Sequence, residues 1–294
     1  MTFTEPIFRP PQESRSIIIR GTQGCTYNKC LFCNLCKKSK FMMTSAEMLE
    51  THLKKISSCQ HRSLPVFLSG ANPFAMSFER LKKLALVIRK YLPNCPYISM
   101  HTRIDDIARK SDKELHELHM LGVDNLYPGT ENGNPDVMAL MNKGATVEDS
   151  IIQLARLREA GICFTANYII GMGGKGMGKA SGRMTAELFN KTHPMRVTTT
   201  GMTVFADTEL HEMRRQGKYT MAPETENVHE LREFLSHLTV ETIVDTRHYL
   251  NVINLEIKMP EQKDKALQSI DLFLRDNDEE QIQDVYKREM FVAM

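Results

Sequence analysis

The chain has 294 residues, a formal net charge of +2, a hydrophobic share of 41% and a charged share of 25%. These values are those of an ordinary globular protein, and the near-neutral charge gives no electrostatic reason to expect a nucleic-acid or membrane partner. The sequence lacks an apolar run of the roughly 18 residues that a transmembrane helix needs, and its polar, proline-rich start is not a signal peptide. We therefore expect a cytoplasmic protein whose thiols stay reduced.

Short apolar runs alternate with longer amphipathic stretches through the first two thirds of the chain. Six runs predict strands, over residues 16–20, 64–70, 97–102, 125–130, 164–174 and 196–205. Amphipathic stretches predict helices between them, over residues 45–56, 77–92, 111–122, 146–161 and 184–193. This alternation predicts an α/β fold with a parallel sheet, either rolled into a barrel or open and doubly wound.

The pattern changes after residue 205. Helical stretches dominate from there, over residues 208–216, 224–238 and 264–275, with a short apolar segment at 249–257 and an amphipathic tail at 276–289. We therefore predict two parts. Residues 1–205 form the βα part, and residues 206–294 form a mainly helical C-terminal extension that covers it.

A cysteine cluster follows the first predicted strand. Cys25, Cys30 and Cys33 form the spacing C-x4-C-x2-C, and Cys36 adds a further x2 step. In a β/α barrel, catalytic groups sit on loops at the carboxyl ends of strands, which is where this cluster falls. The chain has seven cysteines, and an odd count argues against a disulfide framework.

Soft thiolates select zinc, copper or iron–sulfur clusters. A structural zinc site usually needs a second CxxC pair, but Cys59, Cys95 and Cys163 stand alone in the sequence. Three thiolates can hold a [4Fe–4S] cluster and leave one iron with an open position, which a catalytic centre needs. The alternative is a non-enzymatic iron–sulfur or zinc-binding protein that uses Cys36 as its fourth ligand.

The segment GCTYNKCLFC resembles the cysteine motif of the radical S-adenosylmethionine (SAM) enzymes, and in particular the branch with an Elongator-type and oxygen-independent coproporphyrinogen-oxidase-type core. The first gap is x4, where x3 is commonest in that superfamily, and the likeness extends over residues 16–205. The resemblance implies a partial (β/α)6 TIM-like barrel with a [4Fe–4S] cluster on Cys25, Cys30 and Cys33. It further implies reductive cleavage of SAM to methionine and a 5′-deoxyadenosyl radical, which abstracts hydrogen. An electron donor such as flavodoxin or ferredoxin is expected to supply the electron for this cleavage.

The same resemblance implies cofactor contacts at the ends of the strands. Phe32, before the last cysteine of the motif, is expected to pack near the adenine of SAM. Gly70 and Asn72, in LSGANPF, stand where the family's glycine-containing loop meets the methionine amino group.

Three later residues complete the expected SAM site. Glu131, which is followed by the segment Asn142-Lys143-Gly144, is expected to reach the ribose hydroxyls or the methionine of SAM. Arg158, three residues before Gly161, stands where an arginine holds the cofactor carboxylate, a pairing that suits guanidinium. Asn167, on the fifth predicted strand, is expected to point into the barrel and meet the ribose.

A second motif, GGKGMGKAS, resembles a phosphate-binding loop. Gly173, Gly178 and Lys179 fit G-x4-G-K, but Ala180 stands where a Ser or Thr hydroxyl should bind magnesium. We interpret the glycines as a flexible turn beside the cofactor, with nucleotide triphosphate binding as the alternative.

The substrate is constrained chiefly by absences in the sequence. No cobalamin-binding domain, cysteine-rich extension or basic RNA-binding stripe is recognisable, which favours a small-molecule substrate without a nucleic-acid partner. No catalytic side chain acting on substrate can be named. Polar residues that could face substrate end the third strand or lie in the extension: His101, Thr102 and Arg103, and Arg247, His248 and Asn251.

Overall fold

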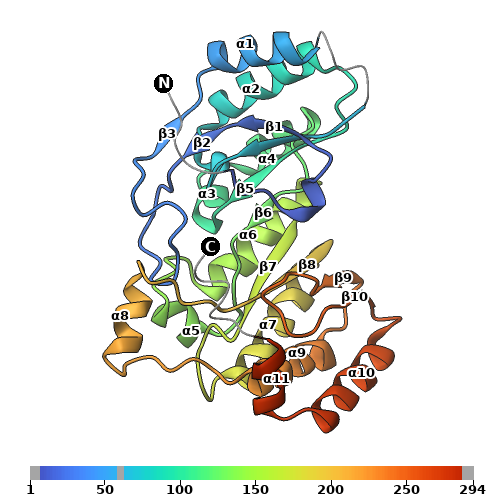
Figure 1. Cartoon of the computed structure of the whole chain (residues 1–294). Coiled ribbons are helices and arrows are strands. Elements are labelled where there is room, and N and C mark those ends of the chain that lie inside the picture. Colours follow the sequence, from blue (N-terminus) through green and yellow to red (C-terminus); the bar gives the residue numbers. More distant parts are fainter. Residues whose placement is uncertain (1–6, 58–62, 287–294) are drawn as a thin grey trace. The chain divides into compact units, whose positions relative to one another are not determined.

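The computed structural model describes residues 7–57 and 63–286 (Figure 1). Two compact units make up the chain. The first comprises residues 1–28, 35–129 and 152–164, and the second comprises residues 29–34, 130–151 and 165–294. Both units interleave strands with helices, which confirms the predicted α/β class.

The first unit contains a parallel sheet. Its strands follow in the order β1 (Ile17–Arg20), β4 (Val66–Ser69), β5 (Ile98–Thr102) and β6 (Tyr127–Pro128). These are the first four predicted strands. All four residues of β4 are buried, and a strand covered on both faces explains why the sequence shows a continuous apolar run instead of alternation.

Helices α1 (Ala46–Ser57), α2 (Phe78–Tyr91) and α4 (Asp112–Met120) lie within this unit. On α2 the buried residues are Leu81, Leu84, Ala85 and Ile88, the spacing of one apolar helical stripe. α4 begins at a capping box between Ser111 and Glu114. Shorter elements complete the unit: α3 (Ile104–Ala108), and 3-10 helices at Pro11–Glu13 and Pro73–Ala75. α6 (Val147–Glu159) begins in a segment of the second unit and ends in the first.

A two-stranded ribbon bounds the cysteine loop. β2 (Thr22–Gln23) pairs antiparallel with β3 (Met42–Met43), and the Thr44 N–H donates to the Gly21 carbonyl over 2.9 Å. The ribbon joins the two ends of the loop. Its strands are too short to be recognised from periodicity.

The second unit contains a four-stranded sheet in the order β10 (Glu256–Met259), β9 (Thr242–Asp245), β8 (Arg196–Gly201) and β7 (Thr165–Ile170). β7 and β8 are the fifth and sixth predicted strands. β7, β8 and β9 are parallel, and β10 is antiparallel to β9. The sequence did not predict β9 and β10, because only two of the four residues in each are apolar, so neither forms an apolar run.

Helices of the second unit are α5 (Pro135–Leu140), α7 (Gly178–Thr192), α8 (Glu209–Arg215), α9 (Glu224–His237), α10 (Lys263–Asp276) and α11 (Glu279–Val285). α7 and α9 pack closely, since a Cβ on Gly182 would lie 2.5 Å from the Glu230 carbonyl oxygen. The Glu279 carboxylate accepts from the N–H groups of Glu224 and Thr225 over 2.9 and 2.8 Å, and thereby caps α9. After residue 205 the described chain contains the helices α8, α9, α10 and α11 together with the strands β9 and β10.

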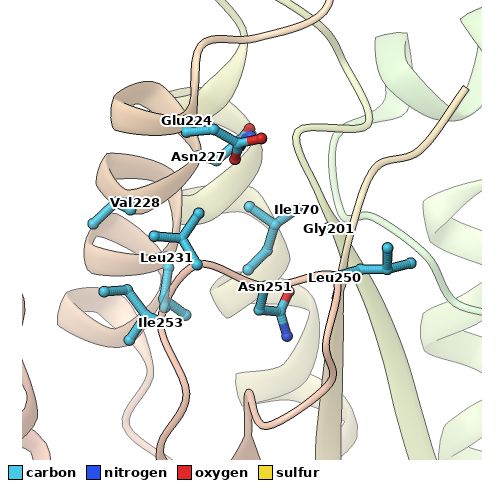
Figure 2. A pocket seen from close by; sticks show the side chains of 10 residues that line it. Ile170, Gly201, Glu224, Asn227, Val228, Leu231, Leu250, Asn251 and Ile253 are labelled. Carbon is cyan, nitrogen blue, oxygen red and sulfur yellow. Dashed lines mark hydrogen bonds between the residues drawn. The ribbon is translucent and has the colours of Figure 1, made fainter. Parts of the chain in front are cut away.

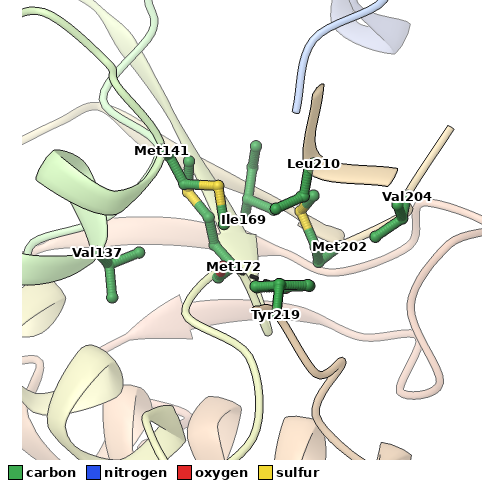
Figure 3. Close-up of a cluster of buried hydrophobic side chains, with 8 residues drawn as sticks. All are labelled: Val137, Met141, Ile169, Met172, Met202, Val204, Leu210 and Tyr219. Carbon is green, nitrogen blue, oxygen red and sulfur yellow. Dashed lines mark hydrogen bonds between the residues drawn. The ribbon is translucent and has the colours of Figure 1, made fainter. Parts of the chain in front are cut away.

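A buried apolar cluster forms a core at the carboxyl ends of β7 and β8 (Figure 3). Its members are Val137, Met141, Ile169, Met172, Met202, Val204, Leu210 and Tyr219. The division at residue 205 stays a prediction, and β9 and β10 beyond it continue the sheet that β7 and β8 begin. Among the helices in the described ranges, none has both the length and the apolar character needed to cross a bilayer.

Candidate functional site

The first unit holds both ends of the cysteine loop. Gly24 precedes Cys25 with φ +77°, and a Cβ there would lie 2.7 Å from the Lys40 carbonyl oxygen, so only glycine fits. At the other end, Asn28 donates from Nδ2 to the Cys36 carbonyl over 3.0 Å. Backbone contacts therefore fix the chain that carries Cys25 and Cys36.

The second unit holds the middle of the loop. The Leu31 N–H donates to the Met141 carbonyl over 3.0 Å, and the Leu31 carbonyl accepts from the Leu210 N–H over 3.0 Å. Asn142 Nδ2 donates to the Lys29 carbonyl over 3.0 Å. These contacts seat the segment that carries Cys30 and Cys33.

The predicted cluster ligands divide between the two units: Cys25 lies in the first, and Cys30 and Cys33 in the second. Within residues 7–57 and 63–286, no three His, Cys, Asp or Glu side chains are gathered as a metal site. The assignment of the three thiolates therefore stays a prediction that rests on their spacing. Cys59 lies outside the described residues.

Phe32 packs, partly buried, against the apolar cluster shown in Figure 3. That cluster includes Ile169 on β7 and Met202 just past β8. An apolar wall next to the cysteine segment is the environment expected for an adenine site. The contact with adenine itself stays a prediction.

Gly70 and Asn72 lie against the first part of the cysteine loop. A Cβ on Gly70, whose φ is +137°, would lie 2.2 Å from Thr22 Oγ1 on β2, so the close approach of β2 requires glycine. The buried Asn72 side chain donates from Nδ2 to Thr26 Oγ1 over 2.7 Å and to Asp106 Oδ2 over 2.8 Å. Asn72 therefore ties the residue after Cys25 to α3. Its predicted contact with methionine stays untested.

Two buried charged residues follow in the same unit, Asp106, which accepts from Asn72, and Lys110. Burial raises the pKa of Asp106 above its usual value, against the opposing effect of the Asn72 hydrogen bond. Lys110 is also buried, and it donates to the Phe74 carbonyl over 2.7 Å with its ammonium 4.2 Å from the Phe74 ring centre. Burial lowers the pKa of Lys110 to about 8. Neither residue was found by sequence reasoning, because an Asp and a Lys in a short polar turn give no signal of burial.

The buried residues Glu131 and Lys143 form one group with the half-buried Asn167. Asn167 Nδ2 donates to Glu131 Oε2 over 2.7 Å, and Lys143 Nζ donates to Glu131 Oε1 over 2.7 Å. The Glu131 backbone has φ +58°; its N–H donates to the Asn167 carbonyl and its carbonyl accepts from the Ile169 N–H. The structure therefore brings together three residues from motifs that the sequence identified separately.

Arg158 lies near the end of α6 with an exposed side chain. Its neighbour Arg156 donates from Nε to Asp112 Oδ1 over 2.6 Å. The predicted role of Arg158 at the cofactor carboxylate stays a prediction.

In the motif that resembles a phosphate-binding loop, backbone amide groups already donate hydrogen bonds to a carboxylate of the protein itself. Glu226 Oε1 accepts from the N–H groups of Gly176 and Gly178 over 2.7 and 3.1 Å. α7 already begins at Gly178, six residues before the predicted start, so Lys179 lies in its first turn with an exposed side chain. Glu226 occupies the position that an anion would take at this helix N-terminus, which disfavours nucleotide binding there.

The remaining predicted polar residues lie in separate surroundings. His101 stacks on Tyr127 with ring centres 5.6 Å apart, and Arg103 lies over the Tyr27 ring at 4.2 Å. Arg247 pairs with Asp245 over 2.8 Å. Asn251, which lines the small cavity in Figure 2, is buried and donates to Thr199 and Thr246 carbonyls. Arg247 and Asn251 therefore have different interaction partners.

Sequence reasoning also missed the buried carboxyl group of Glu230, whose hydrogen-bond donors lie on and just past β7. Glu230 Oε1 accepts from the Tyr168 hydroxyl over 2.6 Å, and Oε2 accepts from the Gly171 N–H over 3.0 Å. Burial raises the pKa of Glu230 to about 8. A glutamate within an amphipathic helix pattern carries no signal of this burial.

Comparison with known families identifies the class of the protein. The family model described as the Radical SAM superfamily matches residues 19–189, more than half of the chain. The chain belongs to the radical SAM superfamily, and it is an enzyme of that class. The match spans the cysteine loop, Glu131 and Asn167.

Individual relatives are more distant. A curated tRNA uridine(34) acetyltransferase from Methanocaldococcus jannaschii is 26% identical over 136 residues, which cover 46% of this chain and 24% of that protein. Thus the chain spans about a quarter of the length of this curated relative.

Solved structures show the same fold. Elp3 from Methanocaldococcus infernus matches with a TM-score of 0.51 and 16% identity, over 76% of this chain and 58% of that one. Coproporphyrinogen III oxidase (HemN) from Escherichia coli matches with a TM-score of 0.51 and 19% identity, over 64% and 44% of the two chains. Methylornithine synthase (PylB) gives a TM-score of 0.53 with 14% identity, over 76% and 63%.

Proposed function

We propose that the protein cleaves SAM reductively at a [4Fe–4S] cluster and uses the resulting 5′-deoxyadenosyl radical to abstract hydrogen from a small-molecule substrate. This proposal rests on the cysteine loop, which lies within the part of the chain that the radical SAM family model matches. Its three thiols have the spacing C-x4-C-x2-C directly after the first strands of the sheet.

Cys25, Cys30 and Cys33 would hold the cluster, since thiolates are its usual ligands and three of them leave one iron open. Bound there, the cluster would supply the electron for reductive cleavage of SAM. The protein supplies position and exclusion of water. The glycine at position 24 and the backbone contacts of Leu31 support the loop on either side of Cys25 and Cys30.

Phe32, Glu131 and Asn167 are the proposed contacts of the nucleoside half of SAM. Phe32 and the apolar cluster around Ile169 offer a surface for the adenine ring. Asn167 and Glu131 offer polar groups for the ribose. Their mutual hydrogen bond and the Lys143 ion pair hold both side chains in place before SAM binds.

Gly70, Asn72 and Arg158 are the proposed contacts of the methionine half of SAM. Gly70 and Asn72 border the cysteine loop through Thr22 and Thr26. Arg158 is the proposed partner of the cofactor carboxylate. In this proposal, Asn72 also positions the loop, because it links Thr26 to Asp106.

Two partners complete the reaction: a one-electron donor such as flavodoxin or ferredoxin, and a small-molecule substrate. Net charge near zero, at +2, supports a substrate other than nucleic acid. The curated tRNA-modifying relative raises tRNA as the competing substrate, and it aligns over only 46% of this chain.

Incubating the enzyme with SAM, a reductant and deuterated metabolite pools tests the proposal. Transfer of deuterium into 5′-deoxyadenosine is the expected result, and it identifies the hydrogen donor. Transfer from deuterated tRNA but from no small molecule would contradict the substrate class. Production of no 5′-deoxyadenosine by a protein that binds about four irons would support the alternative, a non-enzymatic cluster with Cys36 as fourth ligand.

A further inference from the structure

Two residues at the start of α3 lie against the beginning of the cysteine loop. The Arg103 guanidinium carbon lies 4.2 Å from the centre of the Tyr27 ring. Asp106 reaches Thr26 through Asn72, because Asn72 Nδ2 donates to Asp106 Oδ2 over 2.8 Å and to Thr26 Oγ1 over 2.7 Å. All of these residues belong to the first unit. Two consecutive residues of the loop are therefore held by side chains from the first turn of one helix.

The Asn72 amide contacts Thr26 with both of its polar ends. Its Oδ1 accepts from the Thr26 N–H over 3.4 Å, while its Nδ2 donates to the Thr26 hydroxyl. Asp106 fixes this orientation, because its Oδ2 also accepts from the Arg103 N–H over 3.3 Å and therefore serves as an acceptor. An acceptor must face the nitrogen end of the amide. Asn72 and Asp106 are completely buried, so without Asp106 a buried N–H of Asn72 would lose its acceptor.

Arg103 is 7% exposed, an unusual degree of burial for an arginine. Its Nε lies 2.9 Å from Asp105 Oδ1, so its charge is balanced in part within α3. A planar guanidinium group packs on an aromatic face, and the attraction is stronger when the pair is removed from water. Arg103 therefore restrains the ring of Tyr27, which lies two residues after Cys25.

The end of α3 is joined to the segment that carries Asn72. Lys110, which is 3% exposed, follows the helix, and its Nζ donates to the Phe74 carbonyl over 2.7 Å and to the Asp106 carbonyl over 3.3 Å. Phe74 belongs to the 3-10 helix Pro73–Ala75, which begins directly after Asn72. α3 is therefore fixed to this segment through both Asp106 and Lys110, which makes the helix a fixed support for the loop.

We propose that Arg103 and Asp106 are positioning residues for Cys25, the first predicted ligand of the cluster. They hold the residues one and two places after it, so the Cys25 backbone has its place before iron binds. Ordering the loop in advance removes a conformational-entropy cost from cluster assembly. Arg103 and Asp106 act through Tyr27 and Asn72, and they bind no metal themselves. The role of Cys25 as a ligand rests on the proposed function, whereas the restraint on its backbone rests on these contacts alone.

Alkylation of the full-length, iron-free protein tests the proposal with three of its own thiols. Iodoacetamide under anaerobic, metal-free conditions labels reduced cysteines, and peptide mass spectrometry gives a separate rate for each one. Cys25 is half-buried and reports on the loop. Cys95 is 3% exposed and reports on opening of the fold, whereas Cys163 is exposed and reports on the reagent.

Asp106→Ala and Arg103→Met should each raise the labelling rate of Cys25 by about threefold or more, because each lets the loop open locally. The rates at the other two thiols should stay at their wild-type values. Asp112→Ala, at an exposed carboxylate in the first turn of α4, is the matched control and should leave all three rates unchanged.

A double variant tests whether Arg103 acts through Tyr27. Tyr27→Leu should raise the Cys25 rate as Arg103→Met does, and the two changes together should have no larger effect than either alone. Additive effects would overturn the role of Arg103. An unchanged Cys25 rate in Asp106→Ala and Arg103→Met would overturn the whole proposal. Equal acceleration at Cys25 and Cys95 would do the same, since it indicates a general loosening of the fold.

The measurement needs neither cluster nor SAM. Selective acceleration at Cys25 in variants of a protein that makes no 5′-deoxyadenosine would support the loop contacts and contradict the proposed function. Cleavage of SAM by a protein whose Cys25 rate is unchanged in both variants would do the reverse. The two failures are therefore distinguishable.

Discussion

Asn167, on β7, donates a hydrogen bond over 2.7 Å to the carboxylate of Glu131, which lies just past β6. The other oxygen of that carboxylate accepts from the buried Lys143 ammonium. Backbone hydrogen bonds also join Glu131 to β7: the Glu131 N–H donates to the Asn167 carbonyl over 3.0 Å. Two residues proposed to bind SAM are therefore held as one rigid pair.

Replacing Asn167 by alanine should weaken SAM binding. The variant removes one polar group from the proposed ribose site, and the dissociation constant for SAM should rise about tenfold, or about 1.4 kcal/mol. Iron content should stay unchanged because the cysteines are untouched. Equilibrium dialysis with labelled SAM measures the effect, and Asn94→Ala, at an exposed residue, is the matched control. Unchanged SAM affinity in Asn167→Ala would remove this residue from the site.

Replacing Lys143 by methionine should destabilise the protein. The change leaves the Glu131 carboxylate buried without its cation, and loss of one partner of a buried pair costs about 3–5 kcal/mol. Urea denaturation followed by circular dichroism measures the loss. The double variant Lys143→Met with Glu131→Gln removes the stranded charge and should recover part of the stability. A Lys143→Met protein as stable as wild type would show that the pair is solvated in solution.

Replacing Gly70 by alanine should disrupt the cysteine loop. A Cβ at this position would meet Thr22 Oγ1 at 2.2 Å and Thr22 O at 2.6 Å. Gly217 has a positive φ of +70° with nothing within 4 Å of an added Cβ, so Gly217→Ala serves as control for backbone strain alone. We expect Gly217→Ala to cost about 1 kcal/mol and Gly70→Ala to cost more and to lose iron. Equal stability and iron content in the two variants would contradict the close approach of β2.

Glu230 should make stability depend on pH. Burial raises its pKa from the usual value near 4.5 to about 8, so between these values the folded chain holds a proton that the unfolded chain has released. Stability should therefore fall as the pH rises through this window, by up to about 1.4 kcal/mol per pH unit from this group, and level off above it. Glu230→Gln has no proton to lose.

Melting temperatures of wild type and Glu230→Gln between pH 5 and pH 9 test this expectation. The variant should be the more stable of the two at pH 8, and the difference should shrink as the pH falls toward 5. Parallel curves for the two proteins would mean that the carboxyl near Tyr168 and Gly171 titrates normally.

Part of the fold is predictable because strands such as β4 are buried on both faces. Continuous apolar runs such as the one at β4 stand out between glycine and serine boundaries, and all six predicted strands are present. β9 and β10 escape prediction because each has only two apolar residues and so forms no apolar run. The early start of α7 also escapes prediction, because the Gly178 amide at its first position donates to Glu226, which is 48 residues away in sequence.

The candidate site is predictable where residue types carry the chemistry. Cysteine spacing selects the loop proposed to hold the cluster, and Glu131 and Asn167 are selected from their places just past one strand and on another; their roles stay predictions. Their hydrogen bond is not predictable, because it depends on a positive φ at Glu131, a conformation that the residue type does not signal. The link from Asn72 to Thr26 and Asp106 also escapes prediction, since it joins two loop residues to α3 and the three residues are far apart in sequence.

Cleavage of SAM by a cluster on three thiolates is tested most directly by anaerobic reconstitution followed by measurement of iron and 5′-deoxyadenosine. The wild type and Cys36→Ala should each bind about four irons and produce 5′-deoxyadenosine from SAM and dithionite. Cys25→Ala, Cys30→Ala and Cys33→Ala should each lose the cluster and the product. Loss of the cluster in Cys36→Ala, or its retention in any of the other three, would contradict the assignment.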